Sequence, residues 1–232
     1  MASRMPDGGP EIFCSLQGEG VGLGEPAVFL RLAGCNLSCR WCDTRYAWDW
    51  KAYDPREVTL KLKPEEVGQE ILKFRSRYLV VTGGEPLLQQ DELLRLFRLL
   101  DQGTFIEVET NGTILPKSEL VSLVSRWSVS PKLSNSGVPQ DQREVPQVYQ
   151  LFSALPSSFF KFVLEKEGDL EELEELVRKY NLPSEKIVLM PQARDKRTLA
   201  RRSRWLAEVC KTKGYRFSTR LQVLLWENRR GA

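Results

Sequence analysis

Histidine is absent from the 232-residue sequence, and this absence removes several catalytic strategies at once. Without imidazole there is no Ser–His–Asp or Cys–His mechanism, no His-ligated zinc and no imidazole proton relay. Long hydrophobic runs are also missing, since no apolar stretch approaches the roughly 18 residues that span a bilayer. The opening MASRMPDGGP lacks the apolar segment of a secretory signal. We therefore expect a cytoplasmic protein without a membrane partner, whose chemistry uses cysteine, carboxylates, Lys, Arg, hydroxyls or a cofactor.

A strong excess of one charge is lacking too. The 34 Lys and Arg against 31 Asp and Glu give a net charge of +3, which does not by itself indicate direct nucleic-acid binding. We interpret the Arg-rich segment 194–204 and the Glu-rich segment 165–175 as solvated helix faces. Apolar residues make up 41% of the chain, which is typical of a soluble globular protein with a sizeable core.

Cysteine is scarce but concentrated, because three of the five fall within eight residues. Cys35, Cys39 and Cys42 have the spacing C-x3-C-x2-C in GCNLSCRWCDT, and we place a metal-cluster-binding loop at 34–44. An odd total in a cytoplasmic chain argues against a disulfide framework. Three close thiolates favour an iron–sulfur cubane with one open iron, to which S-adenosylmethionine can bind as the source of radical chemistry.

A zinc clip is the alternative use of these thiols. Structural zinc takes four ligands, usually Cys or His. The sequence has no histidine and no second CxxC, so zinc would have to recruit Cys14 or Cys210. We expect both of these cysteines to pack in the core instead.

Strand-like and helix-like segments alternate along the chain. Apolar, β-branched-rich runs occur at 27–32, 78–82, 104–109, 127–130, 159–164, 186–190 and 216–225. Helical periodicity occurs at 64–76, 88–101, 116–125, 145–154, 169–180 and 196–213. This alternation predicts an α/β fold of βαβ units. Six units and a last strand fall short of a closed TIM barrel, so we predict an incomplete (β/α)6-type barrel. No repeat or linker divides the chain, and one domain over 1–232 is expected.

Polar and Gly-rich segments follow five of the predicted strands. They are the cysteine loop, GGEP at 83–86, ETNG at 109–112, Ser130-Pro131-Lys132 and Pro191-Gln192. Because parallel strands end at the same edge of a sheet, we expect these segments to form one concave rim with a shared site. The two glycines of GGEP let the backbone approach a bound ligand, while Glu85 accepts a hydrogen bond from that ligand or buttresses the turn.

At this point the motifs carry a family likeness. C-x3-C-x2-C at 35–42 followed by GGEP at 83–86 resembles the radical S-adenosylmethionine superfamily. Within it, EIFCSLQGEG (11–20) and VFLRLAGCNLSCRWCDT (28–44) resemble the 7-carboxy-7-deazaguanine synthase family. The resemblance runs from residue 11 to the C-terminus and is strongest in the first 90 residues.

The resemblance implies a barrel of the radical S-adenosylmethionine type and an enzyme of queuosine (7-deazapurine) biosynthesis. Such an enzyme converts 6-carboxy-5,6,7,8-tetrahydropterin to 7-carboxy-7-deazaguanine and releases ammonia. It implies a [4Fe-4S] cluster, S-adenosylmethionine used catalytically, Mg2+, a homodimer, and a flavodoxin- or ferredoxin-type electron donor. No side chain is expected to be catalytic in its own right, because the radical forms on the cofactor.

The resemblance also implies roles for single residues. The cluster ligands would be Cys35, Cys39 and Cys42, and the Mg2+ ligand would be Thr44. The pterin would contact Leu16, Gln17, Gly18, Arg31 and Thr82. S-adenosylmethionine would contact Trp41, Cys42, Asp43, Gly84, Ser130, Pro131, Lys132, Gln192, Ala193, Arg194 and Asp195.

The chemistry of two of these side chains fits their implied roles. A guanidinium such as that of Arg31 binds a carboxylate bidentately, and Gln17 offers the donor and acceptor that a pterin edge requires. Glu19 is either a further pterin contact or a structural carboxylate. The family's extreme C-terminus reaches the substrate, and whether the ending NRRGA does so here stays open.

Two other functions remain as alternatives. A glycyl-radical-enzyme activase pairs the same cysteine spacing with a compact fold, but it needs a protein substrate and a large docking face. The LQGEG opening argues against it. A zinc-clip module would bind nucleic acid through Arg201, Arg202 and Arg204, and metal analysis distinguishes it from an iron–sulfur protein.

Overall fold

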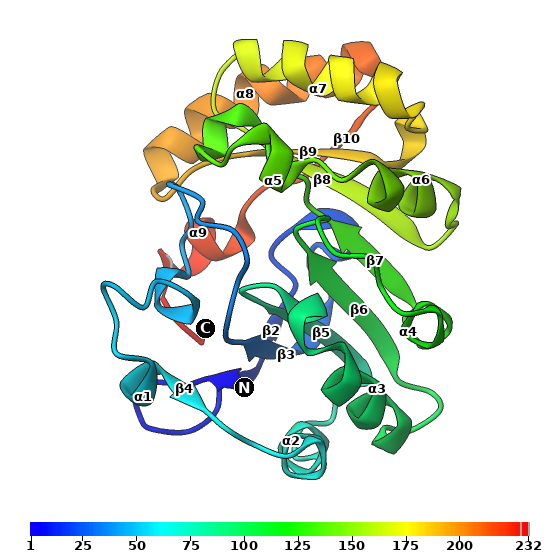
Figure 1. The fold of residues 1–232 in the computed structure, drawn as a ribbon. Helices are drawn as coiled ribbons and strands as arrows, with labels where there is room; N and C mark the ends of the chain where they lie inside the picture. The colour runs from blue at the N-terminus through cyan, green and yellow to red at the C-terminus, as the bar shows by residue number, and fades with distance from the viewer. Residues whose placement is uncertain (228, 232) are drawn as a thin grey trace.

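The computed structural model describes residues 1–227 and 229–231. Within these residues ten strands form one sheet in the order β10-β9-β8-β7-β6-β5-β3-β1-β4, with β2 paired to β3. The sheet curves without closing, and helices cover its outer side (Figure 1). Asn228 and Ala232, which belong to the NRRGA ending, lie outside the described residues.

The strands that build the barrel wall are parallel and consecutive in sequence. They are β3 (Pro26–Leu32), β5 (Tyr78–Gly83), β6 (Phe105–Thr110), β7 (Arg126–Val129), β8 (Ser158–Leu164), β9 (Ile187–Pro191) and β10 (Arg216–Phe217). Most of their residues are buried, which explains why they appear in the sequence as apolar runs. The short strands β1 (Ala2–Ser3), β2 (Ile12–Leu16) and β4 (Thr59–Leu60) extend the sheet in antiparallel fashion. The predicted incomplete barrel is confirmed.

Six helices of the described chain lie at the predicted places: α2 (Pro64–Leu72), α3 (Gln90–Leu99), α4 (Ser118–Leu123), α6 (Pro146–Ala154), α7 (Gly168–Tyr180) and α8 (Lys196–Lys213). The sequence did not predict the short helices α1 (Pro55–Val58), α5 (Gln140–Arg143) and α9 (Leu221–Trp226). The main core fills the space between sheet and helices, and Trp127, Phe152 and Phe160 are among its fully buried side chains.

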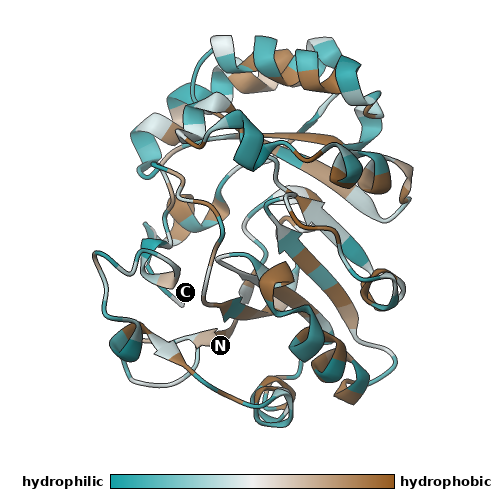
Figure 2. Ribbon diagram, in the orientation of Figure 1, coloured by the Kyte–Doolittle hydropathy of each residue, from teal (hydrophilic) through white to brown (hydrophobic). Residues whose placement is uncertain are grey.

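Local signals account for the ends of α8. Asp195 caps its first turn by accepting a hydrogen bond from the Thr198 backbone N–H at 2.8 Å. Gly214 ends it in the left-handed region at φ 72°. Hydrophilic residues are prominent on α7 and α8, where many of them are exposed (Figure 2). Taken together, the Glu-rich segment 165–175 and the Arg-rich segment 194–204 therefore expose most of their charged side chains to solvent, as their composition indicates.

Two predictions are wrong. The expected strand 216–225 is a strand only at Arg216–Phe217, and Leu221–Trp226 forms the short helix α9. The backbone N–H of Leu221 donates to the Gly18 carbonyl at 2.9 Å, so α9 folds back onto the N-terminal part of the chain. A short apolar run does not by itself distinguish strand from helix.

Cys14 is the second error, because it is exposed on β2 instead of packing in the core. Successive residues of a strand face opposite sides. Phe13 stacks on Phe29 with ring centroids 5.3 Å apart, so Cys14 faces away from that contact. The buried position expected for Cys210 is confirmed on α8.

Candidate functional site

A cavity of about 310 Å³ opens where the parallel strands end. Segments that follow β3, β5, β6, β7 and β9 all contribute to its lining, with Cys35, Gly84, Asn111, Ser130 and Gln192 as one residue from each. The concave rim predicted from the sequence is therefore present, and the segments that form it are brought together by the parallel sheet.

The three motif cysteines lie on this cavity. Cys35, Cys39 and Cys42 line it and pack with Leu37 and Val138. Among the described residues, no three Cys, Asp or Glu side chains converge closely enough to hold a single metal ion. An iron–sulfur cluster binds its thiolates to several iron atoms. Neither Cys14 nor Cys210, which a four-ligand zinc clip would have to recruit, lines the cavity, so the three thiols there suit a cluster better than a zinc clip.

Hydrogen-bond donors surround these sulfur atoms. The Trp48 indole N–H donates to Cys42 Sγ at 3.2 Å, and the Leu37 backbone N–H donates to Cys35 Sγ at 3.4 Å. Such N–H donors set the reduction potential of a cluster. Burial raises the pKa of the Cys35 thiol to about 11. A coordinating metal reverses that effect by deprotonating the thiol, so the donor set fits an iron–sulfur cluster.

The GGEP segment supports the cluster loop from below. The Gly84 N–H donates to the Leu32 carbonyl at 2.9 Å, and the Glu85 N–H donates to the Gly34 carbonyl at 2.7 Å. A Cβ on Gly84 would lie 2.0 Å from the Gly34 oxygen. Gly83 has φ +140°, a conformation that L side chains rarely adopt. The glycines therefore allow the backbone to approach the cluster loop itself.

Glu85 is the buttress of this turn. Its carboxylate is fully buried and accepts from the Leu87 N–H at 2.9 Å, the Thr110 hydroxyl at 2.8 Å and the Asn111 N–H at 2.6 Å. These bonds tie the end of β5 to the end of β6. Of the two roles expected for Glu85, the contacts favour the support of the turn.

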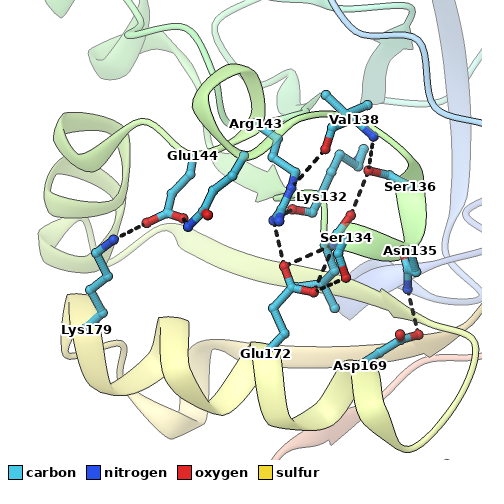
Figure 3. A network of polar contacts seen from close by, with 12 residues as sticks. Lys132, Ser134, Asn135, Ser136, Val138, Arg143, Glu144, Asp169, Glu172 and Lys179 are labelled. Carbon is cyan, nitrogen blue, oxygen red and sulfur yellow. Dashed lines mark hydrogen bonds and ion pairs between the residues drawn. The ribbon is translucent and has the colours of Figure 1, made fainter.

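The segment after β7 holds the far side of the cluster loop. The Trp41 indole N–H donates to Asn135 Oδ1 at 3.2 Å, and the Asn135 amide donates to Asp169 Oδ2 at 2.7 Å. Figure 3 shows this segment tied to α7 by Asn135–Asp169 and by Ser134–Glu172. A residue at the start of α7 therefore fixes an aromatic side chain next to the thiols.

The buried Arg143 guanidinium also holds the segment that follows β7. Arg143 bridges Glu172 at 2.7 Å and donates to the Lys132 carbonyl at 2.9 Å (Figure 3). The Lys132 ammonium in turn donates to Ser130 Oγ at 2.9 Å and lies 5.8 Å from the centroid of the Trp41 ring. This arrangement places one positive charge on the cavity wall beside the cysteine loop.

The cavity also carries the polar residues that the family resemblance assigns to the pterin. The buried Gln17 donates to Glu109 Oε1 at 3.2 Å, and Thr82 donates to Glu109 Oε2 at 2.8 Å. Arg31 Nε donates to Glu11 Oε1 at 2.9 Å. Donors, acceptors and a guanidinium are thus held within one cavity that also contains the three thiols.

Opposite charges also meet on the cavity wall, at Glu19. Glu19 accepts from Lys161 at 2.6 Å, from Arg220 at 3.1 Å and from Gln222 at 2.6 Å. Burial opposes its ionisation, but Lys161 and Arg220 hold the pKa of Glu19 well below its usual range. Arg220 also pairs with Asp43. Both oxygens of Glu19 are engaged by protein groups, which favours the structural alternative for this carboxylate.

Most of the predicted site residues line the cavity. They are Leu16, Gln17, Gly18, Arg31, Cys35, Cys39, Trp41, Cys42, Asp43, Thr44, Thr82, Gly84, Ser130, Lys132 and Gln192. Pro131, Ala193, Arg194 and Asp195 do not belong to its lining. Arg194 is exposed and donates to the Cys42 carbonyl at 3.0 Å. Arg202 of the Arg-rich segment turns inward to Gln192 Oε1 at 2.6 Å.

Several lining residues escape prediction from the sequence. They are Glu11, Tyr46, Lys161 and Arg220. Arg229, Arg230 and Gly231 of the ending NRRGA, whose position the sequence left open, line the cavity as well. Glu11 is the first residue of the EIFCSLQGEG motif and Tyr46 follows the CDT motif by two residues, so both motifs pointed to this part of the cavity. Lys161 and Arg220 lie in segments without a motif, and only the three-dimensional fold brings them to the cavity.

Glu107 on β6 is a further buried carboxylate. Glu107 is 1% exposed and accepts from Tyr78 and from Arg126, the latter at 3.1 Å. Its Oε1 has no hydrogen-bond partner among the described residues. Burial, followed by the charge of Glu109, raises the pKa of Glu107 to about 7.

We expect this carboxyl to make stability fall as pH rises. The folded chain keeps the proton up to about pH 7, whereas an unfolded glutamate loses it near its ordinary pKa of about 4.3. Between these values the folded state binds more protons, so stability decreases by roughly 3–4 kcal/mol as pH rises through that window. Urea unfolding of the parent and of Glu107→Gln at about pH 5 and about pH 8 measures this. An equal pH dependence in both proteins would refute the assignment.

Comparison with known proteins agrees with this geometry. Residues 30–126 match the model of the radical SAM superfamily. This match and the open α/β barrel identify the chain as a radical S-adenosylmethionine protein. It is 39% identical to the 7-carboxy-7-deazaguanine synthase of Pyrobaculum aerophilum over 95% of each chain. It is 32% identical to that of Rhodopirellula baltica, over 95% of this chain and 87% of the relative.

A solved structure shows the same likeness. The crystal structure of QueE from Escherichia coli has a TM-score of 0.67 and 27% identity, over 90% of this chain and 92% of that one. The chain belongs to the 7-carboxy-7-deazaguanine synthase family. Membership implies a [4Fe-4S] cluster, S-adenosylmethionine and a small-molecule substrate. Neither alternative function is favoured. No helix in the described part of the chain is long and apolar enough to cross a membrane.

Proposed function

We propose that this enzyme converts 6-carboxy-5,6,7,8-tetrahydropterin to 7-carboxy-7-deazaguanine with release of ammonia, as a step of queuosine (7-deazapurine) biosynthesis. The observation that carries the proposal is a single cavity that joins three thiols to a wall with Gln17 and Arg31. The names of the relatives support it as well.

The thiols of Cys35, Cys39 and Cys42 are proposed to hold the cluster. A reduced [4Fe-4S] cluster bound there would supply the electron that cleaves S-adenosylmethionine to methionine and a 5′-deoxyadenosyl radical. The residues proposed to bind S-adenosylmethionine are those of the implied set that line the cavity: Trp41, Cys42, Asp43, Gly84, Ser130, Lys132 and Gln192. Arg194 contacts the cluster loop through the Cys42 carbonyl, and we propose that it supports that loop.

The pterin is proposed to lie against Leu16, Gln17, Gly18 and Thr82, all on the cavity wall. Arg31 would bind its carboxylate, because Glu11 engages Nε and leaves the terminal nitrogens to the cavity. A guanidinium that offers two parallel donors to a carboxylate gives orientation as well as affinity.

The same proposal includes Mg2+ at Thr44. Thr44 lines the cavity, and its hydroxyl lies 3.6 Å from Cys42 Sγ. Mg2+ prefers oxygen ligands and usually keeps several waters or substrate oxygens, so one protein hydroxyl is sufficient when a substrate carboxylate completes the set. Asp43 is paired with Arg220, which leaves Thr44 as the oxygen donor of the CDT motif.

The electron donor is proposed to be a flavodoxin- or ferredoxin-type protein that approaches the cysteine loop. Asn36, Ser38 and Arg40 are exposed, while Leu37 and Cys39 between them are buried. The loop therefore reaches the surface and leaves its thiols beneath, which suits electron transfer from a docked redox protein. A homodimer and a cytoplasmic location are proposed from the family resemblance.

Anaerobic turnover tests the proposal directly. Reconstituted protein with S-adenosylmethionine, Mg2+, a one-electron reductant and the carboxypterin should form the deazapurine acid and ammonia in equal amounts. S-adenosylmethionine should not be consumed in proportion to product, because it is regenerated. The matched reaction without S-adenosylmethionine should form no product. Cleavage of S-adenosylmethionine without any deazapurine would reject this substrate while leaving the radical class intact.

A further inference from the structure

Glu11 is a buried carboxylate that the proposed chemistry does not use. It stands directly before β2, is 1% exposed and lies on the cavity wall. Its Oε1 accepts from Arg31 Nε at 2.9 Å and from the Tyr46 hydroxyl at 2.9 Å. Its Oε2 accepts from Arg230 Nη2 at 2.6 Å and from Arg230 Nε at 3.1 Å. Four hydrogen bonds from three elements of the chain therefore converge on one side chain.

The contacts with Arg31 fix that residue on β3. Glu11 receives the Arg31 Nε–H through its carboxylate and the Arg31 backbone N–H through its carbonyl, the latter at 3.0 Å. A guanidinium held by Nε has little freedom to rotate. The hydrogen bond to Glu11 therefore also fixes the orientation of the two terminal nitrogens of Arg31. The Arg31 side chain is 18% exposed and lines the cavity, so these nitrogens are accessible from inside it.

The contacts with Arg230 fix the end of the chain. Beyond its two bonds to Glu11, the Arg230 guanidinium stacks on Tyr46 at 3.6 Å from the ring centroid and also donates to the Arg4 carbonyl. Stacking and bidentate pairing together are the contacts for which arginine is suited. The neighbours Arg229 and Gly231 line the cavity. Glu11 therefore fastens the C-terminal tail, residues 229–231, along the cavity.

The charges of Glu11, Arg31 and Arg230 do not cancel. One carboxylate is shared by two guanidiniums, so the trio of Glu11, Arg31 and Arg230 carries a net positive charge. Removing the carboxylate from such a group leaves two partly buried cations next to each other without the charge that holds them together. An anionic substrate group placed at the terminal nitrogens of Arg31 restores neutrality and favours the docked arrangement.

We propose that Glu11 is a positioning residue that couples the docking of the C-terminal tail to the orientation of Arg31. The docked tail forms one wall of the substrate cavity, and the oriented Arg31 presents its terminal nitrogens to the carboxylate of the substrate. The tail docking stands on the contacts alone, whereas the effect on substrate rests on the proposed function.

The tail is tested on the anaerobically purified holoenzyme by limited trypsin digestion. Trypsin cuts after Arg229 and Arg230, and intact mass follows the loss of the terminal residues. We expect Glu11→Gln to speed this cleavage by roughly tenfold or more, since charge-assisted bonds contribute about 1.5–3 kcal/mol. The matched control is Glu144→Gln, because the Glu144 carboxylate accepts from Lys179 and Tyr180 outside the cavity. Equal cleavage in Glu11→Gln and the parent would overturn the docking.

Substrate kinetics test the coupling. Glu11→Gln should raise the KM for the carboxypterin by roughly tenfold or more, with iron content and the affinity for S-adenosylmethionine unchanged. Arg230→Gln should do the same to a smaller extent, and the double variant should be no worse than Glu11→Gln alone. Additive effects, or an unchanged KM in a variant whose tail is released, would overturn the coupling.

The test still gives an answer if Glu11→Gln does not fold or if the carboxypterin is not a substrate. If Glu11→Gln fails to fold, Arg230→Gln decides both points, because its side chain lies at the chain end: unchanged cleavage after Arg229 refutes the docking, and unchanged KM refutes the coupling. If the enzyme does not act on the carboxypterin at all, the proposed function fails, yet the trypsin result still reports on the tail.

Discussion

Cys39→Ala is expected to abolish both the iron–sulfur cluster and turnover. Cys39 is 8% exposed, lies on the cavity and packs with Leu37 and Val138, so no solvent ligand can take its place. With two thiols left, a cubane loses a ligand that no histidine can replace, because the sequence contains none. The loss of rate should match a whole enzymatic acceleration, roughly 10⁶-fold or more, which means no detectable product.

Iron and sulfide analysis, brown cluster absorption and product formation measure this outcome on anaerobically reconstituted protein. Cys14→Ala is the matched control, since Cys14 is exposed on β2 and does not line the cavity. It should keep full iron content and full turnover. A Cys39→Ala variant that retained parental turnover would remove the cluster assignment, and with it the proposed function.

The part of the site that the sequence predicted is the part built by neighbouring strand ends. Parallel strands place their carboxyl ends at one edge, so the segments beginning at Cys35, Gly83, Glu109 and Ser130 had to meet. Motif spacing identified the thiols, and the alternation of apolar and amphipathic segments predicted the incomplete barrel. These features depend on residues close together in the chain, which is why one sequence is sufficient to predict them.

The part that escaped prediction depends on pairs far apart in the chain. Glu19 meets Lys161 and Arg220, and Glu11 meets Arg230, across separations that no periodicity records. The segment 216–225 shows the local counterpart of this limit. Its apolar residues suit a strand or a helix equally. In the folded chain its second half is a helix, and the Leu221 N–H at the start of that helix donates to the distant Gly18 carbonyl.

Lys161→Met is expected to destabilise the fold strongly. Lys161 is 6% exposed, and its ammonium lies 2.6 Å from Glu19 Oε2. Removing one partner of a buried ion pair costs about 3–5 kcal/mol when the remaining charge has no other partner. Glu19 keeps Arg220 and Gln222, so we expect a loss at the lower end of that range, about 3 kcal/mol. The double variant Glu19→Gln with Lys161→Met should recover part of that loss, since both charges are then gone. Arg220 keeps Asp43 as a partner in that variant.

Lys161→Met should also change how the stability of the protein depends on pH. The pKa of Glu19 is lowered in the folded protein, so the unfolded chain takes up a proton that the folded chain does not. Stability from this carboxylate is therefore fully present above its ordinary pKa of about 4.3 and is lost as pH falls below it. Without Lys161 the pKa of Glu19 rises, and this acid-induced loss becomes smaller.

Urea unfolding of the parent and the variants at about pH 7 and about pH 3 measures both effects. Lys186→Met is the matched control: Lys186 Nζ donates to the Ser153 carbonyl at 2.8 Å and the Leu155 carbonyl at 2.7 Å and forms no ion pair in the described chain. Its cost should be smaller, about 1–3 kcal/mol, because removing it leaves unpaired carbonyls and no unpaired charge. Equal losses at Lys161 and Lys186, with the same pH dependence, would mean that Glu19 is stabilised by Arg220 and Gln222 alone.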